Sequence, residues 1–430
     1  MELNKTEIKN KYKSLIEKLE ATNTSVDEIR KLGAAEFEKI DFPTRKTEEW
    51  KYTKVDDIIV QDYQIAETSS KFTKEEIDNF TFTSFETDLL VFVDGIYSKE
   101  FSRVSQNSDK VKIGNLADNL KTELVEKSLN KLSEVDNAFN AMNTAAVNDG
   151  LFVEVADNQI VEKPVQVLFV SGKSDKTLSM PRNLISVGKN SQISLVVNYA
   201  GVEDSNYFTN SVTEISIGEN STLDYCKIQN ESKAAYHVDK IQVAQEKYSK
   251  LNSFSLSFGG SIVRNDLNTE MKDENIESNF YGLYLASDKQ HIDNHTLADH
   301  AKPNCYSNEV YKGVLSGNSR GVFNGKIMVR PDAQQTNAYQ TNKTILLSDS
   351  ARMDTKPQLE IYADDVKCSH GATVGNVDDM SLFYLQARGI SKETAEMMLV
   401  KAFVFDVVEQ IKIEALQKEI NQLIEQNIKF

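Results

Sequence analysis

The chain has 430 residues, of which 40% are hydrophobic, so it is long enough for two or three domains and can bury a large core. Its formal net charge is −16, and no run of lysine and arginine is present, which argues against a nucleic-acid partner. The three cysteines are far apart and form no CxxC motif, which excludes a disulfide framework and a four-thiolate site built by this chain alone.

The N-terminal segment carries charge where a signal peptide would need an apolar run, and no apolar run approaches the roughly 20 residues that span a bilayer. We therefore expect a cytoplasmic protein without membrane contact. Apolar residues recur at helical spacing over residues 1–40, with a second helical segment over 26–37. The segment 43–53 holds the only tryptophan, Trp50, among charged side chains and predicts an ordered surface element. Residues 112–147 again predict helix.

From about residue 150 to 375 the helical spacing is replaced by short alternating strands, such as 192–197 and 222–228. The turn 187–193 matches the turn 217–223 almost position for position, an offset of 30 residues from Gly188 to Gly218. Weaker copies begin at Ala244 and at Met271, each after a further 27 residues. A period of this length, made of strands and turns, is typical of stacked coils.

We interpret this repeat as a mainly β fold with a right-handed parallel β-helix, or solenoid, at its centre. An antiparallel sandwich is the alternative, and the near-register turns favour the solenoid. The predicted organisation is a helical or mixed N-terminal region over residues 1–150, a β-helix core over 151–386 and a C-terminal helical region over 387–430.

Helical spacing returns after Gly389, with Ser391 as the predicted N-cap and no glycine or proline in residues 390–430. The apolar residues of this region form one predicted stripe: Ala395, Met398, Leu399, Ala402, Phe403, Val404, Val408, Ile411, Leu416, Ile420 and Leu423. The stripe has two interpretations. It either packs on the chain's own solenoid or, with Met397 and Phe405, forms a docking surface for a partner.

Motifs of common enzymes are missing from the sequence. There is no GxxxxGK[ST] phosphate loop, no GxGxxG that opens a helix, and no GxSxG elbow. The acidic residues of the β region do not have the spacing of a polysaccharide-cleaving site. We therefore predict a protein without enzymatic activity of its own.

The segment 364–375 contains Cys368 and His370, two residues apart. On a strand these two side chains share one face with Val366 and Ala372. A thiolate and an imidazole directed at one point suit iron or sulfur chemistry. Valine and alanine on the same face equally suit a packed core, so the spacing leaves both interpretations open. Two ligands cannot complete a cluster site, so such a site would need a partner chain.

His291, His295 and His300 lie close in sequence to Asp293 and Asp299, which raises the possibility of a metal site. On a strand, residues 291, 293 and 295 share a face, and His300 lies on the opposite one. The alternative is a set of polar side chains that line the coils. Each of Cys226 and Cys305 is interpreted as a packed thiol.

Several motifs together resemble the SufB/SufD family of iron–sulfur cluster assembly proteins. They are the segments 43–53, 364–375 and 384–390, with His295-Thr296, His300 and Tyr311-Lys312-Gly313. The resemblance spans nearly the whole chain. The Trp50 segment, the length and the three cysteines favour the SufD branch. The alternative is a SufB-like paralogue that carries the cluster itself.

The resemblance implies a right-handed parallel β-helix with helical ends and a scaffold role in a complex with SufB and the ABC-type ATPase SufC. It implies that SufC docks on the C-terminal helices, for which we predict Met398, Ala402, Phe403 and Phe405. It also implies that a transient cluster or iron forms at the interface with SufB, with His370 and, more weakly, Cys368 as the residues of this chain. No cofactor is expected to bind tightly to this chain alone. A homodimer of the isolated chain is a further expectation.

Overall fold

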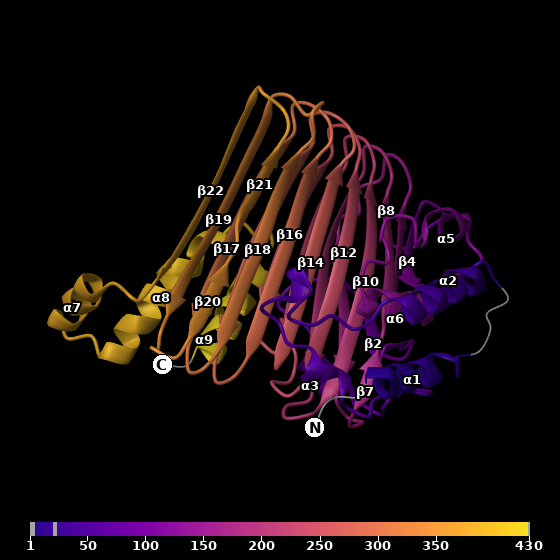
Figure 1. The fold of residues 1–430 in the computed structure, drawn as a ribbon, viewed down its shortest axis with the longest axis horizontal. Helices are drawn as coiled ribbons and strands as arrows, with labels where there is room; N and C mark the ends of the chain where they lie inside the picture. Colours follow the sequence, from indigo (N-terminus) through magenta and orange to yellow (C-terminus); the bar gives the residue numbers. More distant parts are fainter. Residues whose placement is uncertain (1–4, 20–23, 429–430) are drawn as a thin grey trace.

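The structure, a computed structural model, describes residues 5–19 and 24–428. Two long sheets face each other, and the chain passes alternately from one sheet to the other, so that successive strands stack as coils (Figure 1). The predicted parallel solenoid with helices at both ends is confirmed. All strand pairs among the described residues are parallel except β2–β3 and β4–β5.

The first sheet has twelve strands and receives helices of the N-terminal region on its outer face. Its main path runs in the order β20 (Arg352–Thr355), β18 (Arg320–Val329), β16 (His291–His300), β14 (Ile262–Met271), β12 (Tyr236–Gln245), β10 (Tyr207–Ile217), β8 (Arg182–Val187), β5 (Leu151–Val155) and β4 (Val111–Asn115). Three short strands join beside this path: β1 (Gln64–Ile65), β7 (Thr177–Ser179) and β21 (Gln358–Ile361).

The second sheet has ten strands and receives the C-terminal helices. Its order is β22 (Val366–Gly375), β19 (Thr336–Leu346), β17 (Tyr306–Leu315), β15 (Glu277–Ala286), β13 (Lys250–Ser257), β11 (Thr222–Asn230), β9 (Gln192–Gly201), β6 (Val165–Ser171), β2 (Asp88–Val93) and β3 (Ile96–Tyr97). Each sheet also includes a strand from before residue 151: β2 pairs with β6 in the ten-stranded sheet, and β4 pairs with β5 in the twelve-stranded sheet.

The inner faces of the two sheets enclose a lumen that holds one continuous cluster of buried apolar side chains together with some buried polar ones. Alternation along each strand explains this arrangement, since every second side chain points into the lumen. The predicted turn repeat is confirmed where Val187 pairs with Ile217. The next copy was misplaced by one residue: Ile217 pairs with Gln245 and not with Ala244. The number of residues per coil varies, so a repeat of fixed length does not predict which residues pair in the next coil.

One turn of each coil places a residue in the left-handed region. Asn190 has φ of 51° and Asn220 has φ of 55° at the same position of successive coils. Asparagine tolerates this conformation better than most residues with a side chain. The side chains also stack, because Asn220 Nδ2 donates to Asn190 Oδ1 at 2.9 Å. The Gly-Lys-Asn-Ser pattern at residues 188–191 thus marks a turn between two strands of a coil.

Helices of the N-terminal region pack on the outer face of the twelve-stranded sheet through a second apolar cluster. The helices of residues 5–145 are α1 (Lys5–Ile16), α2 (Val26–Lys39), α3 (Asp56–Ile59), α4 (Lys74–Asp78), α5 (Glu123–Ser128) and α6 (Ala138–Ala145), with 3-10 turns η1 (Glu48–Trp50) and η2 (Ala117–Asn119). Gly33 allows α2 to approach α6 closely, since a Cβ there would lie 2.3 Å from the Ala145 nitrogen. The helices predicted within 1–40 are confirmed over the described residues.

The prediction of continuous helix over 112–147 is wrong. The segment begins as strand β4, whose residues alternate between buried and more exposed and pair with β5. Two short helices, α5 and α6, follow. Asn130 takes a left-handed φ of 60° between them, which an α-helix cannot contain. The apolar spacing that suggested one helix arises from a strand and two separate helices.

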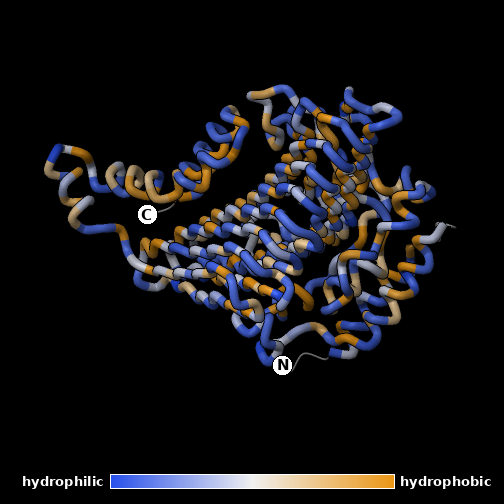
Figure 2. Tube along the Cα trace, turned by 90° about the horizontal axis from the view of Figure 1, so that it is seen from above, coloured by the Kyte–Doolittle hydropathy of each residue, from blue (hydrophilic) through white to orange (hydrophobic). Residues whose placement is uncertain are grey.

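The C-terminal region forms α7 (Asp379–Ala387), α8 (Lys392–Val408) and α9 (Glu414–Asn427). Helices α8 and α9 cover the outer face of the ten-stranded sheet through a third apolar cluster. Ser391 caps α8 as predicted, because its hydroxyl accepts from the Thr394 amide at 3.2 Å. Helix α7, inside the range predicted for the β core, lies away from the stacked coils (Figures 1 and 2). No helix within the described ranges has the length and apolarity needed to cross a membrane.

Candidate functional site

Strand β22 ends the ten-stranded sheet and pairs with β19 on one side only. Within residues 5–19 and 24–428, no strand pairs with its other edge. The strand is ten residues long, and all its residues from His370 to Gly375 are exposed. An unpaired edge of this length offers a row of backbone N–H and C=O groups to another strand. The final coil therefore ends in a surface suited to pairing with a partner chain.

Cys368 and His370 lie on this edge strand, on the face that continues the lumen. Cys368 is in register with Ala338, and His370 is in register with Gln340. Ala338 and Gln340 are both buried. Cys368 packs partly against the apolar lumen cluster, whereas His370 is exposed. The strand confirms that the two side chains share a face, and their role as a ligand pair stays a prediction.

The surroundings of Cys368 disfavour its charged form. Burial raises the pKa of the Cys368 thiol, and a hydrogen bond with the Ala338 backbone offsets part of this effect. The thiolate is the form that binds metal, so iron would have to displace the proton. His370 is the more accessible of the two residues.

The predicted docking residues lie on α8, and the structure separates them. Met398, Ala402 and Phe405 are exposed, at spacings of four and three residues along one side of the helix. Phe403 is half-buried, and the ammonium of Lys312 lies 4.7 Å from its ring centroid. The predicted stripe is right for Ala395, Val404 and Val408, which lie on the buried side of α8, and wrong for Met398 and Ala402, which lie on the exposed side.

Helix α7 adds an apolar surface that the sequence analysis missed. None of its residues is buried, and Met380, Phe383 and Tyr384 are 75%, 67% and 56% exposed. Their spacing of three and four residues places them on one side of the helix. This pattern was available in the sequence, but the segment had been assigned to the β core. Exposed apolar residues in such a row are typical of a surface that binds a partner.

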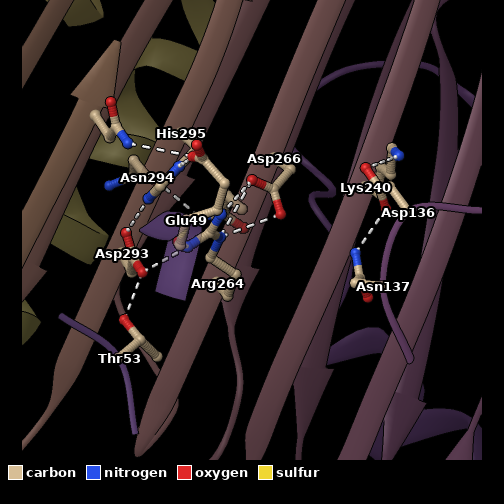
Figure 3. A network of polar contacts seen from close by, with 12 residues as sticks. Glu49, Thr53, Asp136, Asn137, Lys240, Arg264, Asp266, Asp293, Asn294 and His295 are labelled. Carbon is tan, nitrogen blue, oxygen red and sulfur yellow. Dashed lines mark hydrogen bonds and ion pairs between the residues drawn. The ribbon is translucent and has the colours of Figure 1, made fainter. Parts of the chain in front are cut away.

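The segment 43–53 crosses the outer face of the twelve-stranded sheet and is held by side chains of β14 and β16 (Figure 3). Arg264 donates through Nη1 to the Glu49 carbonyl oxygen at 2.7 Å and to Asp293 Oδ2 at 2.9 Å. The Thr53 hydroxyl donates to the same Asp293 oxygen. His295 Nδ1 lies 3.5 Å from Glu49 Oε2. These contacts fix the N-terminal segment to the solenoid.

Trp50 belongs to this segment, but its side chain is only 3% exposed. Its ring packs on Phe139 of α6, with the ring centroids 5.4 Å apart. The prediction of an ordered element is confirmed, but its assignment to the surface is wrong for Trp50. The charged neighbours take the outer positions, and the indole completes the apolar cluster beneath them.

The histidine-rich strand β16 divides as predicted. His291 and His295 share the outer face with Asp293, and His300 points into the lumen, where its Nε2 lies 2.9 Å from Ser307 Oγ. Burial lowers the pKa of His300 to about 4. Burial and Arg264 lower the pKa of His295, but Asp293 and Glu49 outweigh them, so that this pKa is raised.

These residues do not form a metal centre. Across the described part of the chain, no group of three or more His, Cys, Asp and Glu side chains is placed to hold a metal ion. The polar side chains of β16 serve the contacts with segment 43–53 and the lumen instead. Cys226 and Cys305 are buried, and burial raises the pKa of their thiols to about 12 and about 11. Both are packed thiols, as predicted.

The lumen also holds charged and polar groups that were not predicted from the sequence. Lys227 Nζ donates to Asp239 Oδ2 at 2.5 Å, with both side chains almost fully buried. Glu309 is fully buried and accepts hydrogen bonds from Thr296 and Gln340. Their residue types resemble an exposed strand face, so only the register of the coils assigns them to the interior.

The fold and these surfaces define a class of protein: a parallel β-solenoid with helices at both ends, an edge strand left unpaired among the described residues, and exposed apolar residues on α7 and α8. Residues 169–403 match the family model for the SufBD core domain of the SUF system of iron–sulfur cluster assembly. Residues 4–167 match the model for the SufBD protein N-terminal region. The chain belongs to the SufBD family of iron–sulfur cluster assembly proteins.

Curated relatives are similar over nearly their whole length. An iron–sulfur cluster assembly SufBD family protein of Synechocystis is 28% identical, covering 98% of this chain and 96% of the relative. The iron–sulfur cluster assembly protein SufD of Escherichia coli is 29% identical, covering 90% and 89%. The chloroplastic protein ABCI7 of Arabidopsis thaliana is 30% identical, covering 92% and 86%. The family predicted from the sequence motifs is thereby confirmed.

Proposed function

We propose that this chain is the SufD-type scaffold subunit of an iron–sulfur cluster assembly complex and has no enzymatic activity of its own. It pairs through β22 with a SufB-type chain and binds a SufC-type ATPase on its C-terminal helices. The nascent cluster, or its iron, is the cargo at the β22 edge. The observation that carries this proposal is the unpaired ten-residue edge strand with His370 exposed on it.

The edge supports pairing with a similar chain because both partners would contribute strands. Main-chain hydrogen bonds along an added strand supply affinity without requiring a matching side-chain pocket. His370 and Cys368 offer only two ligands, which is fewer than a cluster needs. The remaining ligands would come from the partner chain, so the site is complete only in the complex.

The apolar sides of α7 and α8 support the binding of the ATPase. Met398 and Phe405 are 45% and 61% exposed although they are large and apolar. The opposite side of α8 is buried on the solenoid, so a partner can bind without displacing the helix. Force from ATP hydrolysis by that partner would reach this chain through α8.

The proposal is tested with His370→Ala in a complex reconstituted from this chain and its SufB- and SufC-type partners. We expect the complex to assemble and cluster formation, followed by visible absorbance, to slow by about tenfold or more because a ligand is lost. Ser369→Ala is the matched control, since Ser369 is exposed on the same strand and points to the opposite side. Normal cluster formation with His370→Ala would show that the proposed site is wrong.

The SufB-like alternative, in which this chain itself carries the cluster, depends on Cys368. It is the only one of the three cysteines that is not buried. Cys368→Ser in the same complex should abolish cluster binding under the alternative. Under the scaffold proposal it should reduce cluster formation less than His370→Ala.

A further inference from the structure

One row of the ten-stranded sheet leads from the interior of the solenoid to its edge. Glu309 on β17 is in register with Gln340 on β19, and Gln340 is in register with His370 on β22. Adjacent strands lie about 4.8 Å apart, so side chains of one row on one face are neighbours. Glu309 and Gln340 are buried, and His370 is exposed. The Gln340 amide therefore stands in the row between a buried carboxylate and the exposed imidazole.

The hydrogen bonds of this row have a direction. Gln340 Nε2 donates to Glu309 Oε2 at 3.1 Å, and Thr296 Oγ1 donates to the same oxygen at 2.7 Å. An ionised carboxylate only accepts hydrogen bonds, so Glu309 selects the amide orientation in which the Gln340 NH₂ group faces inward. The carbonyl oxygen of that amide is then the atom available to other donors.

The side-chain carbonyl oxygen of Gln340 is buried. Gln340 Oε1 has no hydrogen-bond partner among the described residues. Buried acceptors in proteins are normally paired, so an unpaired one next to a functional residue calls for an explanation. The lumen is built to hold this amide, because a Cβ on Gly325 of the facing sheet would lie 2.3 Å from Gln340 Nε2. The imidazole of His370 occupies the next position of the same row.

We propose that Gln340, oriented by Glu309, is a positioning residue for His370. Its Oε1 accepts a hydrogen bond from one ring N–H of His370 and leaves the other ring nitrogen unprotonated and free to meet iron at the edge. This inference rests on the proposed function, in which His370 contacts the cargo. Metal-binding histidines generally donate their second ring N–H to such an acceptor, which fixes both tautomer and ring orientation.

The tautomer of His370 can be measured in the isolated full-length chain, without cargo or partners. Nitrogen-15 NMR of histidine-labelled protein at about pH 8 distinguishes the two neutral tautomers. The chain has only five histidines, and the His370→Ala variant identifies the signals of His370. We expect one tautomer to dominate in the unaltered chain.

Two variants test the row. Gln340→Leu removes the acceptor, and Glu309→Gln keeps size and hydrogen bonding but lets the Gln340 amide adopt either orientation. Both should give a mixture of tautomers, and both should slow cluster formation about tenfold in the reconstituted complex. The control is Asn342→Leu, which removes a buried amide from the same face of β19. Asn342 is in register with Ala372, so this variant should keep the tautomer of the unaltered chain.

An unchanged tautomer in Glu309→Gln and Gln340→Leu overturns the inference, and so does the same mixture in Asn342→Leu. Should Gln340→Leu fail to fold, Glu309→Gln decides alone. The two proposals also fail separately. If the tautomer responds as expected but His370→Ala assembles clusters normally, the positioning role stands and the proposed function falls. If His370→Ala abolishes cluster assembly but the tautomer of His370 is unchanged in Gln340→Leu and Glu309→Gln, the positioning role is wrong.

Discussion

The guanidinium of Arg264 lies over the ring of Trp50, 4.5 Å from the ring centroid. A cation over an aromatic face is attracted by the ring, and burial strengthens this contact. Arg264 also holds Asp293, which belongs to the next strand of the sheet. Burial by itself would raise the pKa of Asp293, but Arg264 and His295 outweigh it and lower that pKa well below its ordinary value. One arginine thus links the N-terminal segment to two strands of the solenoid.

Arg264→Met should lower the free energy of unfolding by about 3–5 kcal/mol, because it removes the strongest of the charges that stabilise the buried Asp293 carboxylate. Chemical denaturation measures this change. Limited proteolysis should also show faster cleavage within residues 43–53. Lys189→Met is the control, since Lys189 pairs with Glu219 and both side chains are well exposed, at 54% and 44%. That variant should lose less than about 1 kcal/mol. Equal losses in the two variants would contradict the role given to Arg264.

Glu309 should make the stability of the chain depend on pH. Burial raises the pKa of Glu309 to about 7 from an ordinary value of 4.5, although hydrogen bonds from Thr296 and Gln340 stabilise its charge. The Glu309 charge in turn helps to raise the pKa of Tyr311. Between these two values the folded state binds more protons than the unfolded state, so stability falls as pH rises. The total loss is about 3 kcal/mol.

Glu309→Gln should remove this slope, because glutamine does not titrate. Thermal or chemical unfolding between pH 4.5 and pH 7 measures the difference between the variant and the unaltered chain. Above this window the variant should be the more stable of the two. An identical slope in both proteins would mean that the Glu309 carboxylate is better solvated than its burial indicates.

Phe405→Asp should abolish binding of the SufC-type ATPase and leave the fold intact, because Phe405 is 61% exposed and its neighbours on α8 carry the packing. Isothermal titration calorimetry measures binding, and circular dichroism with thermal unfolding measures the fold. Val404→Asp is the matched control, since it places the same charge one residue away on the buried side. It should lower the melting temperature. Unchanged ATPase binding by Phe405→Asp would exclude this side of α8 as the docking surface.

Ala372→Lys should weaken every association that uses the edge of β22. An inward-pointing lysine on an edge strand opposes pairing with another strand. Ala372 is exposed, so the melting temperature should not change. Analytical ultracentrifugation would follow both the self-association expected of the isolated chain and its pairing with the SufB-type chain. If the variant associates like the unaltered chain, the partner does not bind at this edge.

Much of the solenoid could be predicted because its coils repeat a local pattern. The alternation of 192–197 and 222–228 gave strands β9 and β11, and the Asn190 and Asn220 corners set the repeat. The register beyond Ile217 could not be obtained in this way, since the offset between paired residues falls from 30 (Val187 to Ile217) to 28 (Ile217 to Gln245) and 26 (Gln245 to Met271). In addition, the weaker corner at Tyr248 has no glycine or asparagine.

The candidate site was predicted in part. The alternation of side chains along a strand placed Cys368 and His370 on one face. That β22 is an edge strand follows only from the order of strands in the sheet. The side of α8 that packs could not be separated from the exposed side, because both carry large apolar residues such as Val404 and Phe405. Likewise, the row of Glu309, Gln340 and His370 joins residues some thirty positions apart, and only strand pairing brings them together.

Strand β17 contacts α8 on its outer face and carries Glu309 on its inner face. Lys312 on its outer face donates to the Phe403 carbonyl oxygen at 2.5 Å and contacts Asp406, which fastens α8 to the strand. Glu309, three residues earlier, lies on the inner face. A mechanical load that a bound partner applies to α8 therefore enters the solenoid at the strand that carries the buried carboxylate, about 10 Å of extended chain away. In the proposed function, the docked ATPase would therefore act on the same strand that holds the carboxylate behind His370.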